Sequence, residues 1–221
     1  YFTVVTIARL DLFAGTIVFP ETDVEYMLIL AVILCCYGAY LGFEALGRSS
    51  VISAVFVIPA LIFIMLTLVN KVDFLNLTPI FYNGVIPVVK VAVDSVGQTV
   101  EYGIIALVLP KVTGNIKKGF FLWLVSQTLL MAIMFFFATT VMGNFAGTQL
   151  FPFHTLASLA EFSMFSRLDA IFTSVWIMCA FIKAGLLIFL QTEILTTYFG
   201  RFKRIYYLIA IGVITIITNL F

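Results

Sequence analysis

Residues 119–153 read GFFLWLVSQTLLMAIMFFFATTVMGNFAGTQLFPF, thirty-five positions without Asp, Glu, Lys or Arg. A helix that crosses a bilayer needs about 20 mostly apolar residues, so this stretch is long enough for one span and an apolar loop. Three more stretches are apolar and free of charge: 26–43, 49–70 and 205–221. The sequence therefore predicts an all-α membrane protein with several spanning helices.

Composition supports the same fold class. Of 221 residues, 63% are hydrophobic and 10% are charged, whereas about 25% are charged in soluble domains. So few polar side chains could not cover the surface of a soluble protein, and we expect lipid to be the main solvent. The net charge of +1 offers no electrostatic argument for binding nucleic acid. Cys35, Cys36 and Cys179 lie in apolar runs without metal or disulfide spacing, and are predicted to be small buried hydrophobic residues.

Three further apolar stretches are interrupted by charges: 1–19, 82–110 and 168–192. With them the prediction is seven spans, the first and last incomplete. The chain begins at Tyr1 without Met and ends at Phe221 inside an apolar run, and its first stretch lacks the marks of a signal peptide. We expect one integral membrane domain over 1–221, cut from a longer protein at both ends.

The basic residues of the loops predict the orientation. Two loops, separated by two spans, carry clusters of Lys and Arg and are assigned to the cytoplasm. Counting back places Arg48 inside and the acidic loop 20–25 outside, and Lys71, which falls outside, is the one residue that departs from this pattern. The clusters are Lys111, Lys117 and Lys118, and Arg201, Lys203 and Arg204.

The charges within the predicted spans fall on helical stripes. A charge inside a bilayer is costly and usually faces a cavity or another helix. The stripes indicate either a central solute or ion site between three helices, or a set of interhelical ion pairs; Asp94 or Glu101 could then pair with Lys183. Asp11 points away from its stripe. The stripes are Thr6, Arg9, Phe13 and Thr16; Lys90, Asp94, Gln98 and Glu101; and Asp169, Thr173, Trp176 and Lys183.

The stretch 82–110 is a poor uninterrupted helix, because Pro87, Gly97 and Gly103 surround the polar segment 94–99. A helix broken near the midplane exposes backbone groups that can hold a small ligand or an ion. A kinked helix whose small residues allow close packing explains the same pattern. Both interpretations stay open at this point.

Other polar residues carry less functional information. Glu44 and Arg48, four residues apart near a helix end, are predicted to form a structural ion pair. His154 is the only histidine and is expected at the surface of an outer loop. The sequence shows no nucleophile with a matching base, no metal cluster and no phosphate loop, so we expect neither an enzyme nor a cofactor.

Four short motifs along the chain resemble those of one family. Residues 42–48, GFEALGR, read as G-x-E-x-x-x-R after an apolar helix, and 19–22, FPET, resemble a Leu-Pro-x-Thr-Pro turn in which Asp23 replaces the second Pro. Residues 167–177, RLDAIFTSVWI, resemble an E-R-x-D-x-x-x-x-x-W segment in which Ser166 replaces the acidic residue, and Glu also precedes an apolar helix ending in Pro at 101–110. In this order and spacing they resemble the spore germination B-subunit family, the permease component of germinant receptors.

This resemblance implies a fold. The family belongs to the amino acid–polyamine–organocation superfamily, whose LeuT-like fold has ten helices in two inverted repeats of five. On that template, residues 1–221 correspond to the third to ninth helices, and 82–110 to the broken sixth helix. The third, sixth and eighth helices line the solute site of this architecture. By helix position the resemblance therefore implies ligand-binding residues, which are Thr6, Ser95, Gly97, Gln98, Thr173 and Trp176.

The resemblance also implies a function. Such a subunit binds a small nutrient, such as an amino acid, in the inner membrane of a bacterial spore and triggers germination. Its expected partners are the A and C subunits of the receptor. A secondary amino acid transporter of the same superfamily is the alternative, with Lys183 or Asp94 coupling protons, and a structural scaffold that binds no ligand is a third reading.

Overall fold

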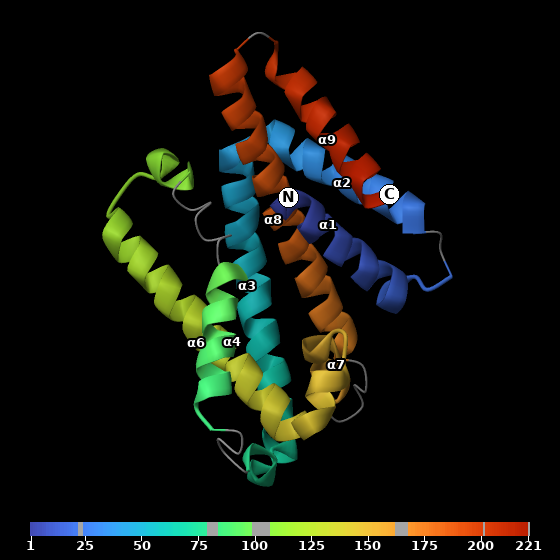
Figure 1. The fold of residues 1–221 in the computed structure, drawn as a ribbon, viewed down its shortest axis with the longest axis vertical. Helices are drawn as coiled ribbons and strands as arrows, with labels where there is room; N and C mark the ends of the chain where they lie inside the picture. The colour runs from blue at the N-terminus through green and yellow to red at the C-terminus, as the bar shows by residue number, and fades with distance from the viewer. Residues whose placement is uncertain (22–23, 79–83, 99–106, 162–167, 201, 221) are drawn as a thin grey trace. The chain divides into compact units, whose positions relative to one another are not determined.

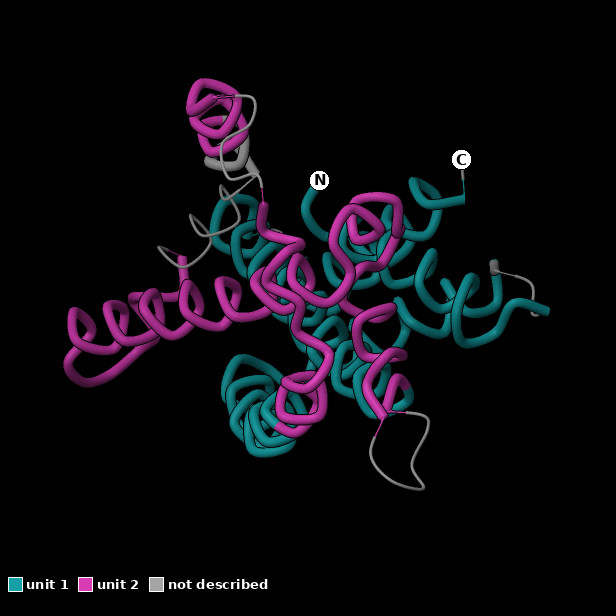
Figure 2. Tube along the Cα trace, turned by 90° about the horizontal axis from the view of Figure 1, so that it is seen from below, with its two compact units in different colours: residues 1–62, 170–221 teal, residues 63–169 magenta. Residues whose placement is uncertain are grey.

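The computed structural model describes residues 1–221 except 22–23, 79–83, 99–106, 162–167, 201 and 221. For residues 24 and 94–98 it describes the backbone but not the side chains. Every regular element among the described residues is a helix. The chain divides into two compact units (Figure 2): the first comprises Tyr1–Ile62 and Ala170–Phe221, and the second Phe63–Asp169. The expectation of a single domain over 1–221 stays a prediction, because each unit is described by itself.

The first unit contains α1 (Phe2–Phe13), which continues into the π-helical turn η1 (Ala14–Val18), then α2 (Val24–Leu41) and most of α3 (Phe43–Leu68). Nearly all of α8 (Asp169–Phe199) and the whole of α9 (Arg204–Leu220) complete it. Figure 1 shows α9 running alongside α2, with α1 beneath them. Two segments far apart in sequence thus form one helical unit.

Small residues set the helix spacing in this unit. A Cβ added at Gly212 of α9 would lie 2.9 Å from the Sγ atom of Cys36, and one added at Gly185 of α8 would lie 3.2 Å from Cδ2 of Leu46. Helices in membranes associate through such close approaches, since lipid supplies no hydrophobic driving force between them. Arg204, at the start of α9, donates to the carbonyl of Ala39 at 3.0 Å, and its guanidinium lies 4.8 Å from the ring centre of Phe189.

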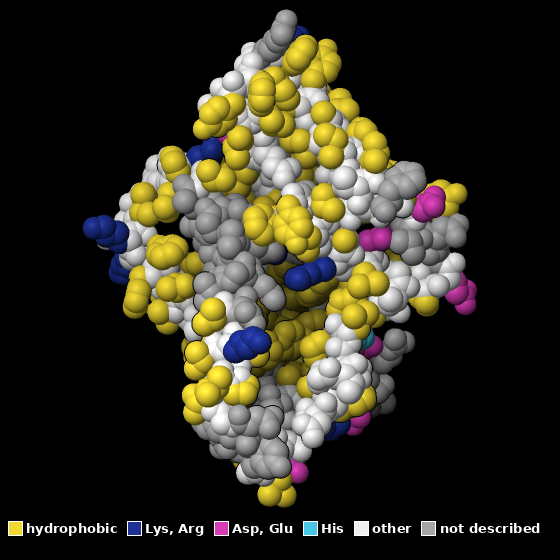
Figure 3. All heavy atoms as spheres, in the orientation of Figure 1, with side chains coloured by type: hydrophobic (Ala, Val, Ile, Leu, Met, Phe, Trp, Pro, Cys, Tyr) yellow, Lys and Arg dark blue, Asp and Glu magenta, His cyan; other side chains and the backbone are white. Residues whose placement is uncertain are grey.

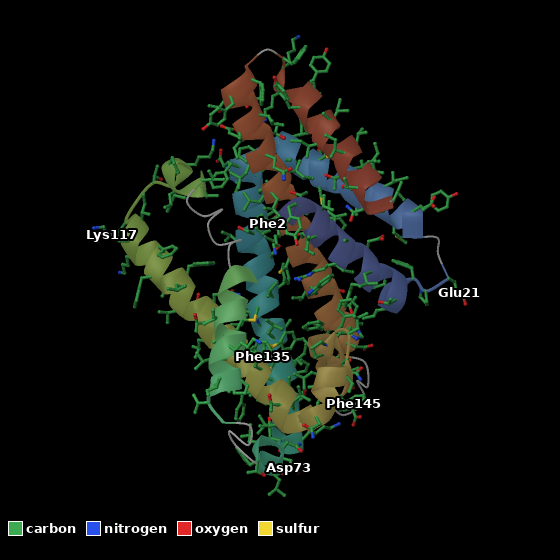
Figure 4. The ribbon with its side chains drawn as sticks, viewed as in Figure 1. Phe2, Glu21, Asp73, Lys117, Phe135 and Phe145 are labelled. Atoms are coloured by element: carbon green, nitrogen blue, oxygen red, sulfur yellow. The ribbon has the colours of Figure 1, made fainter. Side chains whose placement is uncertain are left out.

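The second unit contains the outer end of α3, the short 3-10 turns η2 (Val69–Lys71) and η3 (Phe74–Leu77), and α4 (Ile86–Gln98). It continues through η5 (Leu109–Lys111), α6 (Ile116–Met142), η6 (Gly143–Thr148) and α7 (Pro152–Ser158). Figure 4 places Lys117 at the start of α6 and Asp73 just before η3. In the same view Glu21 lies in the turn after η1. The apolar segment 119–153 is thus one long helix, a turn and the start of a short helix.

Hydrogen bonds attach the segment around η3 to the C-terminal end of α6. The Asn76 amide donates to the carbonyl of Thr140 at 2.8 Å, and the backbone N–H of Asp73 donates to the same carbonyl at 3.2 Å. Lys71 donates to the carbonyl of Leu159 at 2.8 Å and lies 3.4 Å from the Glu161 carboxylate. These contacts give Lys71, which departs from the predicted charge pattern, local partners for its charge.

The helices bear out the membrane assignment. Three described segments are long and apolar enough to cross a bilayer: Phe43–Lys71, Ile116–Thr148 and Asp169–Phe199. Glu25–Leu41 and Arg204–Leu220 are shorter apolar helices. Hydrophobic side chains cover much of the face in Figure 3, and charged ones are few. The chain is an all-helical, polytopic membrane protein, and three of its full-length spans lie within the described residues.

Candidate ligand site on α1 and α8

Two buried threonines distinguish the inner face of α1. Thr3 is 1% exposed and Thr6 is 7% exposed, and neither hydroxyl makes a hydrogen bond to any described residue. Threonine hydroxyls in helices commonly donate to a carbonyl one turn earlier, as Thr215 does to Ile211 at 2.7 Å. A buried hydroxyl without a partner is costly. Thr3 and Thr6 therefore offer hydrogen-bonding capacity that the described protein does not use.

An aromatic contact joins α1 to α8 at the C-terminal end of α1, two turns beyond Thr6. The rings of Phe13 and Trp176 lie 4.2 Å apart between centroids, at an interplanar angle of 34°. The two helices run in opposite directions (Figure 1). Seven residues separate Phe13 from Thr6 and Trp176 from Lys183, which is about 10.5 Å along either helix. Lys183 thus lies at about the level of Thr6, on the same side of α8 as Trp176.

The C-terminal end of α1 departs from α-helical geometry where it continues into η1. In η1 the backbone N–H of Phe19 donates to the carbonyl of Ala14 at 2.8 Å, five residues back, and Thr16 donates to the carbonyl of Leu12 at 2.7 Å. Such turns occur frequently at functional sites. One carboxylate oxygen of Asp11, one turn before η1, is buried without a hydrogen bond to any described residue. Polar groups without protein partners thus occur along much of α1.

The structure splits the stripe predicted on 1–19. Thr6 and Phe13 are buried in the first unit, whereas Arg9 and Thr16 are exposed. Residues at i and i+3 differ by about 60° around a helix, so Arg9 lies at the margin of the face that Thr6 occupies. Thr3 belongs to the buried face, and its spacing from Thr6 could have revealed it in the sequence. Only part of the predicted stripe is therefore buried.

The stripe on α8 lies on the border between buried and exposed surface. Asp169, Thr173 and Trp176 are half-buried, and Lys183 is exposed. The fully buried residues of α8 lie on other positions, among them Phe172, Val175 and Ile188. A half-buried face suits a site that a ligand could reach. Of the predicted residues, the structure brings Trp176 into contact with α1 through Phe13.

The residues predicted on 82–110 belong to the second unit. Asp94, Ser95, Gly97 and Gln98 lie within α4, which is helical through Gln98. The polar segment where the break was predicted is therefore helical over 94–98, whereas its side chains, residue 99 and Glu101 lie outside the described residues. The convergence of all three stripes on one site therefore stays a prediction.

Two polar residues lie away from this face. Glu44 and Arg48 form the predicted ion pair at the start of α3, and both side chains are largely exposed, so the pair contributes little to stability. His154 is half-buried in α7 rather than at the open surface, and burial lowers the pKa of its imidazole while nearby Asp169 opposes that shift. No cluster of three metal-ligating side chains occurs in the described ranges.

A family comparison gives this arrangement its context. The sequence model of a family described as spore germination protein matches residues 1–221, the whole chain. The chain belongs to the spore germination protein family. No curated protein and no solved structure matches it.

Membership in the spore germination protein family decides the broad class of function. The family is one of permease-like, non-enzymatic receptors and transporters, and its members are membrane proteins. This agrees with the apolar helices and with the resemblance carried by the four sequence motifs. The partnerless hydroxyls of α1 and the Phe13–Trp176 contact are thus features of a membrane receptor or permease.

Proposed function

We propose that this spore germination family member is the nutrient-sensing membrane subunit of a germinant receptor. Its ligand is a small nutrient such as an amino acid, bound between α1 and α8 and triggering germination. The observation that carries the proposal is the pair of buried hydroxyls, Thr3 and Thr6, that lack hydrogen-bond partners among the described residues. A buried polar group retained without a partner is best explained by a ligand that supplies one.

The neighbouring side chains suit an amino acid. A zwitterion needs a cation for its carboxylate and hydrogen-bond acceptors for its ammonium group, because a buried charge without partners is costly. Lys183 offers the cation at about the depth of Thr6, and the threonine hydroxyls can accept as well as donate. Trp176 and Phe13 form an apolar wall for a side chain. Ser95, Gly97, Gln98 and Thr173 remain proposed contributors.

Sensing requires that the ligand prefer one of two arrangements of the helices. The turn η1 lies directly beyond Phe13, so a ligand that separates or tightens the Phe13–Trp176 contact acts on the junction between α1 and the outer loop. Partner A and C subunits in the inner membrane of the spore would detect this change. A secondary amino acid transporter is the second candidate function, and the exposed Lys183 within α8 favours it, since a lysine at this depth could couple protons.

A binding experiment on the full-length protein in lipid nanodiscs tests the site. The twenty standard amino acids are screened by thermal shift, and the affinity for each stabilising one is measured by calorimetry. Thr6→Val and Trp176→Ala should weaken binding at least about tenfold, a loss of about 1.4 kcal/mol. Thr215→Val, which removes a buried hydroxyl already bonded to its own helix, should leave affinity unchanged. Equal effects of Thr6→Val and Thr215→Val would disprove the site.

A liposome experiment separates sensing from transport. Radiolabelled ligand identified by the screen is offered to proteoliposomes with and without an imposed proton gradient. Binding without accumulation supports a sensor, whereas gradient-driven uptake that Lys183→Gln abolishes would establish the transporter. If no nutrient stabilises the protein at all, the scaffold reading replaces both.

A further inference from the structure

A groove of about 510 Å³ runs between α3 and α8 within the first unit. Its lining comprises Ser49, Ile52, Ser53, Ser174, Ile177, Met178, Phe181 and Ile182. On α8 these residues lie on the side opposite Trp176, because Ile177 and Phe181 differ from it by about 100° and 140° around the helix. The groove is therefore separate from the proposed nutrient site, and an inference about it does not rest on the proposed function.

The groove begins next to a close contact between the two helices. Near the start of α3, Gly185 lets α8 approach Leu46 closely, and the rings of Phe43 and Phe189 lie 6.1 Å apart. One turn further along each helix, at Ser49 and Ile182, the lining of the groove begins. Because the apolar candidate span of α8 runs from Asp169 to Phe199, residues 174–182 lie inside it. The groove thus lies at the depth of the hydrocarbon.

The lining contains no charged side chain. The hydroxyls of Ser49 and Ser174 donate to carbonyls of their own helices, Ala45 and Ala170, each at 2.9 Å. Ser53 is 5% exposed, so it adds a hydroxyl at the wall but no charge. A zwitterionic or ionic headgroup would find no counter-charge here. The chemistry suits an uncharged aliphatic chain, which gains by leaving water or by filling space among Ile, Met and Phe side chains.

The groove is continuous with the exposed apolar surface of α3. Val51, Val55 and Phe56 are 66%, 64% and 63% exposed, and Ile52 lines the groove while being 60% exposed itself. In a spanning helix such side chains face lipid. We propose that the groove between α3 and α8 holds an acyl chain of a bilayer phospholipid.

A bound acyl chain would have a physical consequence. Ser49 and Ser53 recur at i and i+4, a spacing of small residues that lets a partner approach a helix closely. A chain seated there would fill the space between the two helices beyond the contact of Gly185 with Leu46. The lipid would thereby hold α3 and α8 at a defined separation at mid-membrane.

Photolabelling of the full-length protein tests this proposal. Nanodiscs contain phosphatidylcholine with a diazirine in the middle of one acyl chain, and adducts are mapped by mass spectrometry after irradiation. Adducts on peptides carrying 49–53 and 174–182 should exceed those on the exposed face of α6 at least fivefold. Ser53→Phe, which fills the groove, should reduce them at least fivefold. Val55→Phe, which places the same ring on the exposed face of the same helix, should not.

Three results would overturn the proposal. Equal labelling of all exposed helices means ordinary annular lipid only. Saturable labelling of the groove by free photo-leucine, with no enrichment of lipid adducts, means that it takes a nutrient side chain. Absence of both adducts means that another transmembrane helix covers the groove. Ser174→Phe, at an exposed position on the rim, replaces Ser53→Phe if the latter fails to elute as folded protein, and the same fivefold loss is expected.

Discussion

Replacing Gly143 by alanine tests how the segment around η3 is attached to α6. Gly143 ends α6 with φ 55° and ψ −135°, a backbone conformation that alanine adopts only under strain. An added Cβ would also lie 2.9 Å from Oδ1 and 3.1 Å from Cγ of Asn76. Asn76 cannot move away without disturbing its hydrogen bond to the Thr140 carbonyl. Backbone strain and a side-chain clash therefore act together at one position.

The expected loss of stability is the sum of two terms. A residue held in a sparsely populated backbone region costs about 1–3 kcal/mol, and a weakened hydrogen bond adds about 1 kcal/mol. A total of about 3 kcal/mol corresponds to roughly 6–12 °C in Tm for a chain of this length. Asn76→Ala removes the clash but not the strain. The double variant should therefore lose less stability than the two single variants added together.

The assay is thermal unfolding in nanodiscs, followed by circular dichroism. Gly147→Ala is the matched control, since Gly147 lies in the next turn, has no positive φ and has nothing within 4 Å of an added Cβ. We expect its Tm to stay within about 1 °C of wild type, because surface changes without such features are close to neutral. The reasoning fails if Gly143→Ala is no more destabilising than Gly147→Ala.

Three further predictions concern other contacts. Gly212→Ala should destabilise the α2–α9 packing by about 1–3 kcal/mol through the Sγ atom of Cys36, and Cys36→Ala should restore the Tm; an unchanged Tm in the single variant would contradict the close approach. Because burial lowers the pKa of His154, the folded state binds fewer protons than the unfolded one, so stability should be full above about pH 6.5 and fall as the pH drops below it. Thermal unfolding from pH 7.5 to 5 should therefore show a Tm that falls with pH in wild type and falls less steeply in His154→Gln; an equal fall of Tm in both proteins would refute the prediction. Glu161→Gln should change the Tm little, because its ion pair with Lys71 is largely exposed. Lys71→Met should lower the Tm more, because it also leaves the Leu159 carbonyl without its donor; a larger fall in Glu161→Gln would show that charge pairing dominates.

Much of the fold was predictable because it depends on composition and length. The long uncharged stretches became α3 and α6, and the interrupted stretch 168–192 became part of the 31-residue helix α8. The Glu44–Arg48 pair was predictable because residues at i and i+4 meet on any helix. The stretch 1–19 was predicted as one span, and its helix changes from α-helical to π-helical geometry where α1 meets η1; the span predicted over 82–110 stays a prediction, because 99–106 lie outside the described residues. Length of an apolar run does not reveal where a helix changes its hydrogen bonding, as α1 does at η1.

The candidate site was only partly predictable. The spacing of Thr6 and Trp176 placed both on polar stripes, but it could not show that Phe13 stacks on Trp176. Nor could it separate buried Thr6 from exposed Arg9, which share a stripe in the sequence. Cys179 was expected to be buried and is exposed. In a helix that is apolar all round, the sequence contains little information on which side meets protein and which meets lipid.

The sequence alone determined that this protein lies in a membrane, where its helices run and, through its four motifs, which family it belongs to. These properties follow from hydropathy, helical period and short motifs, all of which are local along the chain. The tertiary structure decided which hydroxyls of α1 are buried without partners, what neutralises Lys71 and where α3 and α8 leave a groove. The reason is physical: these features depend on close packing between segments as distant as Ser49 and Ser174, and small residues permit such packing without specifying it.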